Sequence, residues 1–208
     1  MISTEPSSIT LTEISRQGIA PSVFTRIYEP DCQLVNWQRP LSVAVADYAA
    51  ALSRQDHAIS MRELLAPAAV SAALYSRLPD LPGRDDFVAD AQQLAEMFAC
   101  LFELRRVGLR LASLQTAMCP RFHVDRVPCR LVTTYAGSGT HWLNQAQRNQ
   151  VLDSGGREPE RWQRLMAGEV ALLKGDGWED NDGQGLWHRS PPASIGYRRL
   201  FLSLDFAE

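Results

Sequence analysis

The feature of this 208-residue sequence that most constrains its fold is a change of pattern at Gly108. Before it, residues 41–55, 60–78 and 86–107 carry apolar side chains at helical spacing, with Pro67 interrupting the middle stretch. After it, short alternating runs are bounded by Gly, Pro and Asp, a pattern typical of strands. Helices that precede strands, rather than alternate with them, predict an α+β fold or a β-barrel supported by helices.

The runs after Gly108 divide into candidate strands. These cover residues 109–118, 130–136, 140–143, 169–175, 185–190 and 198–206. A short helix is expected around residues 160–166. Four prolines interrupt the first 40 residues, so a partly ordered arm is expected there. We therefore predict an N-terminal arm (1–40), a helical region (41–108) that packs on the barrel, and a β core (109–208).

Composition narrows the class of protein. The net charge is −3 and the basic residues form no stripe, so a nucleic-acid partner is not expected. No apolar run is long enough to cross a membrane, and residues 1–8 lack the charge and apolar pattern of a signal peptide. A cytoplasmic protein, monomeric or homodimeric, that acts on a small molecule or a protein is therefore expected. In that reducing compartment its four cysteines are not expected to form disulfides.

The histidines suggest a metal site. His123 and Asp125 are two residues apart, so in extended backbone their side chains project to the same face and can reach one ion. His188 closes a candidate strand just before Pro191 and Pro192, which makes it the best third ligand. Two imidazoles and one carboxylate leave three coordination positions open, which suits Fe(II) in an oxygenase.

The last candidate strand has two distinct faces. One face carries Arg199, Phe201, Ser203 and Asp205, whereas the other carries Arg198, Leu200, Leu202 and Leu204. The mostly apolar second face is expected to face a core. An arginine near the site can form a bidentate pair with a carboxylate, which would suit 2-oxoglutarate. Arg198 and Arg199 are both candidates for this role. Tyr135, which shares a strand face with Thr133, is a further candidate contact to a co-substrate.

Other interpretations of these residues stay open. His123 and Asp125 can form a hydrogen-bonded structural pair with no ion. Cys119, His123 and Cys129 offer a softer ligand set that would suit tetrahedral zinc, although their spacing is not that of a zinc finger. Small apolar packing is the simpler role for both thiols.

The order of these residues resembles that of the Fe(II)/2-oxoglutarate-dependent dioxygenases. The matching pieces are His123-Val124-Asp125, the distant His188, and Arg199 followed four residues later by Ser203. The resemblance implies a double-stranded β-helix of the jelly-roll or cupin type, with N-terminal helices buttressing it. It also implies that His123, Asp125 and His188 hold Fe(II), that Arg199 or Arg198, with Ser203, contacts 2-oxoglutarate, and that O2 drives its decarboxylation to succinate while a substrate is oxidised.

The chain as a whole resembles a bacterial family known only as a domain of unknown function. The phrases that carry this resemblance are FHVDRVPCRLVTTYAGSGTHWL and LWHRSPP. Members of that family are often linked to zinc-homeostasis loci. The resemblances imply an oxygenase of unknown substrate, or alternatively a non-catalytic zinc-binding protein on the same barrel. A barrel that binds no metal and serves as an interaction module is a third possibility.

Overall fold

A computed structural model describes residues 13–192 and 198–207 of the chain. Its helices are 3-10 helix η1 (Pro21–Tyr28), α1 (Val43–Ser53), 3-10 helix η2 (Pro67–Ala69), α2 (Val70–Tyr75), α3 (Arg84–Leu101) and α4 (Gln145–Asp153). Its strands are β1 (Ser15–Gly18), β2 (Leu34–Trp37), β3 (Ser60–Leu65), β4 (Val107–Leu114), β5 (Cys129–Ala136), β6 (His141–Trp142), β7 (Gln163–Arg164), β8 (Val170–Lys174), β9 (His188–Arg189) and β10 (Arg199–Phe206).

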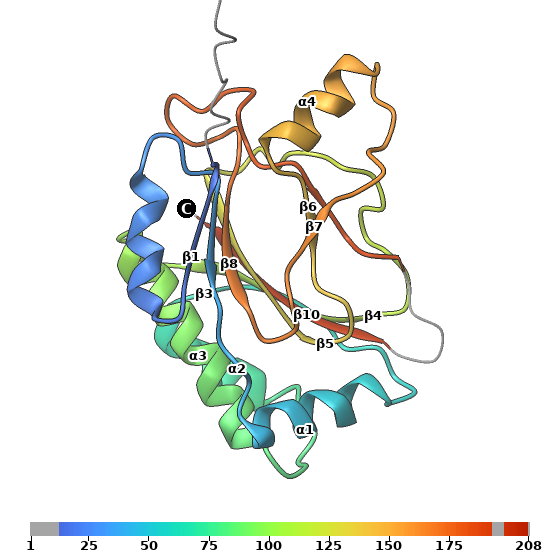
Figure 1. The fold of residues 1–208 in the computed structure, drawn as a ribbon. Coiled ribbons are helices and arrows are strands. Elements are labelled where there is room, and N and C mark those ends of the chain that lie inside the picture. The colour runs from blue at the N-terminus through green and yellow to red at the C-terminus, as the bar shows by residue number, and fades with distance from the viewer. Residues whose placement is uncertain (1–12, 193–197, 208) are drawn as a thin grey trace, which may run out of the picture.

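The larger of two sheets has seven strands in the order β1-β2-β8-β5-β10-β4-β3. All neighbours in it run antiparallel except β1 and β2, which are parallel. The last of the described strands, β10, lies inside the sheet between β5 and β4 (Figure 1). The fold is therefore a mixed α/β fold with a large, mainly antiparallel sheet.

Helices η1, α1, α2 and α3 pack on one face of this sheet (Figure 1). Helix α1 contacts β5 and β10, and α3 contacts α1 and β4. The alternation of β10 explains this packing, because Leu200, Leu202 and Leu204 join the buried helical residues in one apolar core. The sequence pattern predicted this face correctly. None of the described helices is both long and apolar enough to cross a membrane.

A smaller sheet covers the opposite face. Its strands follow the order β7-β6-β9. A second apolar cluster joins residues in or next to the strands of the two sheets: Leu34, Val132, Trp142, Leu165, Ala171, Leu173, Leu186 and Phe201. Phe201 thus points away from the leucines of its own strand, and the polar residues beside it face the space next to the smaller sheet.

Three segments differ from the sequence predictions. Residues 60–65, expected in a helix, form the edge strand β3, whose Met61 is buried while Arg62 is exposed. The helix expected near 160–166 is also wrong, since β7 lies there. Helix α4 forms earlier, where Asn144 and Gln147 make a reciprocal capping box.

The larger sheet draws strands from both sides of residue 108. Strands β1 and β2 lie within the segment expected to be a partly ordered arm; they pair with each other, and β2 also pairs with β8. Residues 1–12 of that predicted arm lie outside the described part of the chain. Long-range pairing of short strands explains the difference, because four residues carry little periodicity of their own.

Candidate metal centre

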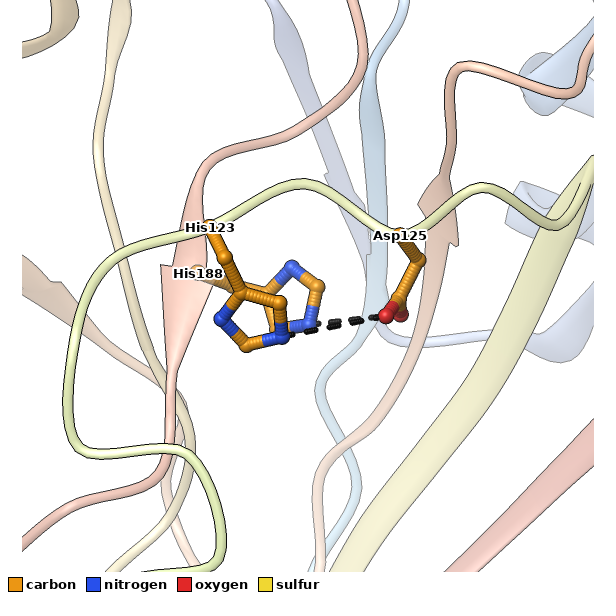
Figure 2. Close-up of side chains that lie close together, drawn as sticks. All are labelled: His123, Asp125 and His188. Atoms are coloured by element: carbon orange, nitrogen blue, oxygen red, sulfur yellow. Dashed lines mark ion pairs between the residues drawn. The ribbon is translucent and has the colours of Figure 1, made fainter.

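His123 and His188 lie directly opposite each other in an antiparallel bridge. The backbone N–H of His123 donates to the carbonyl of His188 at 3.0 Å, and the N–H of His188 donates back at 2.9 Å. The two rings therefore project on the same side, with their centroids 4.6 Å apart (Figure 2). Strand β9 holds one ring and the irregular segment before β5 holds the other.

Asp125 completes the cluster from the same segment as His123. Its Oδ2 lies 3.3 Å from Nε2 of His188, and its Oδ1 lies 3.8 Å from Nε2 of His123 (Figure 2). The three side chains offer ligand atoms that all lie within 4.8 Å of one another. Ligand atoms about 2.1 Å from one ion, at right angles, are separated by roughly 3 Å. The arrangement is therefore close to that of a three-ligand metal site.

Backbone carbonyls fix the orientation of both imidazoles. Nδ1 of His123 lies 3.1 Å from the carbonyl of Arg121, and Nδ1 of His188 lies 3.1 Å from the carbonyl of Leu186. A carbonyl only accepts hydrogen bonds, so each neutral ring carries its proton on Nδ1. Each Nε2 then presents a lone pair toward Asp125, as metal-binding histidines require.

Charge around the cluster favours a cation. Burial alone would raise the pKa of Asp125, but the protonated form of His188, through a hydrogen bond and its charge, and the charges of Arg130 and His123 lower this pKa to about 2. Burial and the neighbouring His188 lower the pKa of His123. At neutral pH the site therefore offers an ionised carboxylate and an unprotonated His123, which are the ligand forms that bind metal.

Arg130 positions the carboxylate. Its Nη1 donates to Oδ2 of Asp125 at 2.7 Å, and its Nε and Nη2 donate to the carboxylate of Asp205 at 2.6 and 3.2 Å. Asp205 lies opposite Arg130 in the pairing of β10 with β5. Arg130 thus ties the His-x-Asp segment to the final strand. Sequence reasoning did not single it out, because its partner lies 75 residues away.

A glycine loop packs against the backbone of the His-x-Asp segment. The N–H of Asp176 donates to the carbonyl of Asp125 at 2.9 Å. A Cβ on Gly175 would lie 2.1 Å from the carbonyl oxygen of Val127 and 2.6 Å from that of Asp125. A Cβ on Gly185 would lie 2.3 Å from Cγ1 of Val124. Only glycine therefore allows this close approach.

Arg199 shares a pocket with the histidines. Its side chain points between the sheets, where Nη2 donates to the hydroxyls of Thr134 and Thr140 at 2.9 Å each. Arg199 is only 8% exposed, burial lowers its pKa to about 10, and its Nη1 has no hydrogen-bond partner among the described residues. Within that part of the chain no carboxylate pairs with this buried guanidinium.

The structure separates the other candidates. Ser203 lines the same pocket as Arg199, His123 and His188. Arg198 does not, since its guanidinium donates to the carbonyl of Asp56 at 3.0 Å. The ambiguity between the two arginines is therefore settled by strand alternation in favour of Arg199 as the residue that faces the pocket.

Tyr135 lies outside this pocket. Its ring packs on Phe87 of α3 with centroids 4.5 Å apart, and its hydroxyl lies 2.7 Å from Oδ2 of Asp90. It is 3% exposed and belongs to the core beneath the helices. The expected contact of Tyr135 with a co-substrate is therefore wrong, because it occupies the helix-facing side of β5, whereas Arg130 and Val132 face the pocket.

The cysteine-containing ligand set is not brought together. Cys129 lies in the helical core, and burial raises the pKa of its thiol strongly. Cys119 reaches the pocket, but among the described residues the only group with metal-ligand geometry is His123, Asp125 and His188. The thiols therefore give no support to tetrahedral zinc.

Comparison with known proteins places these features in context. A profile of the family described as "Protein of unknown function (DUF1826)" matches residues 18–205. No curated protein matches the sequence.

Two solved structures share the fold. AtDAO1, the dioxygenase for auxin oxidation 1 from Arabidopsis thaliana in a binary complex with 2-oxoglutarate, aligns with a TM-score of 0.55 and 10% identity, over 93% of this chain and 92% of that one. A full-length Neurospora crassa protein in complex with alpha-ketoglutarate and 5-formyluracil aligns with a TM-score of 0.51 and 11% identity, over 99% of this chain and 87% of that one. At this level of identity the likeness establishes the fold alone.

Proposed function

This chain belongs to the DUF1826 family, and from the geometry of its candidate site we propose that it is an Fe(II)/2-oxoglutarate-dependent oxygenase. One observation carries the proposal: the two histidines of a two-histidine, one-carboxylate cluster line the same pocket as a buried arginine that has no carboxylate partner among the described residues. The fold supports it, because AtDAO1 and the Neurospora crassa protein were captured with 2-oxoglutarate and alpha-ketoglutarate, two names for the same molecule.

The ligand set fits Fe(II) better than structural zinc. His123, His188 and Asp125 would hold the ion through nitrogen and oxygen atoms, and no thiolate takes part. Three protein ligands on one face leave positions open for a chelating co-substrate, which is the arrangement of non-haem iron oxygenases. A closed structural zinc site would need a fourth protein ligand.

Arg199 would bind the distal carboxylate of 2-oxoglutarate. A buried guanidinium without a counter-ion is costly, and its unpartnered Nη1 marks where an acceptor is missing. The hydroxyls of Thr134 and Thr140 accept from Arg199, so their own protons are free to be donated to a ligand. Ser203 would contribute to the same subsite.

Each residue has a distinct part in the chemistry. The carbonyls of Arg121 and Leu186 hold both imidazoles with Nε2 forward, and Arg130 holds the carboxylate of Asp125 ionised and oriented. Bound Fe(II) and 2-oxoglutarate would supply oxidation by O2, with release of succinate and CO2. Phe201 and Val132 would limit water around the site. We further propose that the two sheets correspond to a double-stranded β-helix with the helices as its buttress.

The proposal is tested by assaying 2-oxoglutarate binding and turnover, and by comparing variants of the adjacent Arg198 and Arg199. We expect anaerobic addition of 2-oxoglutarate to the Fe(II)-loaded protein to give a metal-to-ligand charge-transfer absorption, and aerobic incubation to give succinate. Arg199→Gln should weaken 2-oxoglutarate binding about tenfold or more, because a charge-assisted pair is lost. Arg198→Gln, which removes the same charge one residue away, should leave binding unchanged.

The zinc alternative predicts a different result. The oxygenase proposal would be contradicted by a protein that binds Zn²⁺ tightly at the same three residues but does not bind 2-oxoglutarate. Such a protein would give no charge-transfer band when loaded with Fe(II) and no calorimetric signal with 2-oxoglutarate. Equal 2-oxoglutarate affinity in the Arg199→Gln and Arg198→Gln variants would contradict the role given to Arg199.

A further inference from the structure

The pocket beside the metal ligands contains more positive charge than the proposed reaction uses. Five arginines line it: Arg62, Arg110, Arg130, Arg189 and Arg199. Such a concentration is unusual in a chain whose net charge is −3. The positive charge is therefore local to this pocket and is not a general property of the surface.

Three of the five have an assigned counter-charge. Arg130 pairs with Asp125 and Asp205, and Arg189 pairs with Glu158 at 2.8 Å. Arg199 is the proposed partner of 2-oxoglutarate. Arg62 and Arg110 make no salt bridge to any carboxylate in residues 13–192 and 198–207.

The sheet register places these two arginines side by side. Arg62 of β3 lies directly opposite Arg110 of β4, and Arg110 lies opposite Ser203 of β10. Like charges directly opposite each other on antiparallel strands destabilise a sheet. Burial lowers the pKa of Arg110, and the charges of Arg62 and Arg130 lower it further. The two guanidinium groups therefore repel each other, and an anion bound beside them would relieve this repulsion.

We propose that Arg62 and Arg110 bind an oxyanion group, a carboxylate or a phosphate, on a small-molecule substrate of the oxygenase. The proposal rests on the proposed function, and it adds a substrate class to it. One row of the sheet runs from Ser203, next to the co-substrate subsite, through Arg110 to Arg62 at the edge strand. A substrate anchored at this pair would extend toward the histidines, which line the same pocket.

A compact anion fits better than a polyanion. A nucleic acid would be expected to contact a basic stripe on the protein surface. Here the arginines line one pocket that His123 and His188 also line, and the chain as a whole is acidic. Paired guanidinium groups match the planar oxygens of a carboxylate or the oxygens of a phosphate.

The test uses the full chain loaded with Zn²⁺, which is redox-inert, and saturated with 2-oxoglutarate. Calorimetry is carried out with inorganic phosphate and with butyrate, and 2-oxoglutarate affinity is measured separately on every variant. We expect Arg62→Gln and Arg110→Gln to weaken anion binding about tenfold or more while 2-oxoglutarate affinity is unchanged. Arg105→Gln, an exposed arginine before β4, is the charge-matched control. Arg110→Lys should restore part of the binding, which a folding defect would not.

The anion that binds the wild-type protein more tightly identifies the group on the substrate. Anion binding that is absent from the wild type, or equal in Arg110→Gln and Arg105→Gln, would overturn the inference. A loss of 2-oxoglutarate affinity in Arg110→Gln as large as in Arg199→Gln would also overturn it, since the pair would then anchor the co-substrate. A protein that binds phosphate through this pair but never binds 2-oxoglutarate would contradict the proposed function itself.

Discussion

His123 and His188 are held opposite each other by two reciprocal backbone hydrogen bonds, although 65 positions separate them in the numbering of the chain. Their rings are placed by main-chain pairing and by carbonyls at Nδ1, so both sets of contacts come from the chain itself. The two imidazoles are therefore preorganised. Preorganisation predicts that the metal ligands can be removed without loss of the fold.

Replacing one imidazole should remove the metal and spare the structure. We expect His188→Ala to abolish stoichiometric binding of Fe(II) or Zn²⁺, because two ligands remain, while the backbone pairing of β9 with β6 persists. Elemental analysis and circular dichroism check the two halves of this prediction. His57→Ala changes an exposed histidine and should bind metal normally. Full metal occupancy in His188→Ala would contradict the assigned site.

Arg130 should matter for metal binding without touching the ion. Arg130→Gln removes the hydrogen bond that orients Asp125 and the pair with Asp205. Loss of such an orienting partner typically lowers metal affinity about 10- to 100-fold. Competitive titration against a chelator measures the change. Arg126→Gln, an exposed arginine in the same segment, is the control, and equal affinities in the two variants would refute the positioning role.

Gly175 should tolerate no side chain. In Gly175→Ala the new methyl would overlap the carbonyl oxygens of Val127 and Asp125, so the His-x-Asp segment must shift. We expect a loss of stability of about 1–3 kcal/mol, together with weaker metal binding. In Gly108→Ala the nearest atom would lie 3.6 Å from the new Cβ, so that methyl makes only ordinary contacts. Urea unfolding of both variants tests the difference.

His141 should make the protein acid-sensitive. Burial, followed by the charges of Arg189, Arg164 and Arg199, lowers the pKa of His141 from 6.5 to about 4. Between about pH 6.5 and pH 4, His141 is protonated in the unfolded chain but not in the folded protein. The free energy of unfolding therefore falls as the pH drops from about 6.5 to about 4.

His141→Gln removes this titration, so its urea midpoint should decline less over that window than the wild-type midpoint. His57→Gln should behave like the wild type. Parallel pH profiles for wild type and His141→Gln would show that another group causes the decline.

Tyr135 should affect stability and leave co-substrate binding alone. Tyr135→Phe removes a buried hydrogen bond to Asp90, whose carboxylate also pairs with Arg39. Hydrogen bonds to charged groups contribute about 1.5–3 kcal/mol, so a loss of that order is expected. Its 2-oxoglutarate affinity should equal that of the wild type. A selective loss of 2-oxoglutarate affinity in Tyr135→Phe would contradict the position of Tyr135 outside the pocket.

The sequence was most informative where the signal is local. His123 and Asp125 are two residues apart, and the alternation of residues 198–206 correctly divided a core face from a pocket face. Both patterns depend only on the period of an extended strand. The joining of His188 to this pair was an inference about non-local contact, and the structure brings the three side chains together.

What the sequence could not show depends on register between distant strands. Arg130 gains its role from Asp205, and Arg62 meets Arg110 only because β3 pairs with β4 at one particular offset. The sequence also did not show that Tyr135 faces the helices and not the pocket. Both faces of β5 are largely buried, so its sequence does not reveal which face is covered by helices and which by the smaller sheet.

The position of β10 has a consequence for how the protein is made. This strand is synthesised after the other nine described strands, yet it lies between β5 and β4 and carries both Arg199 and the partner of Arg130. A nascent chain therefore cannot join β5 to β4 until β10 has been made, and termination between residues 189 and 198 would yield a polypeptide with all three metal ligands but without Asp205, the β10 partner of Arg130.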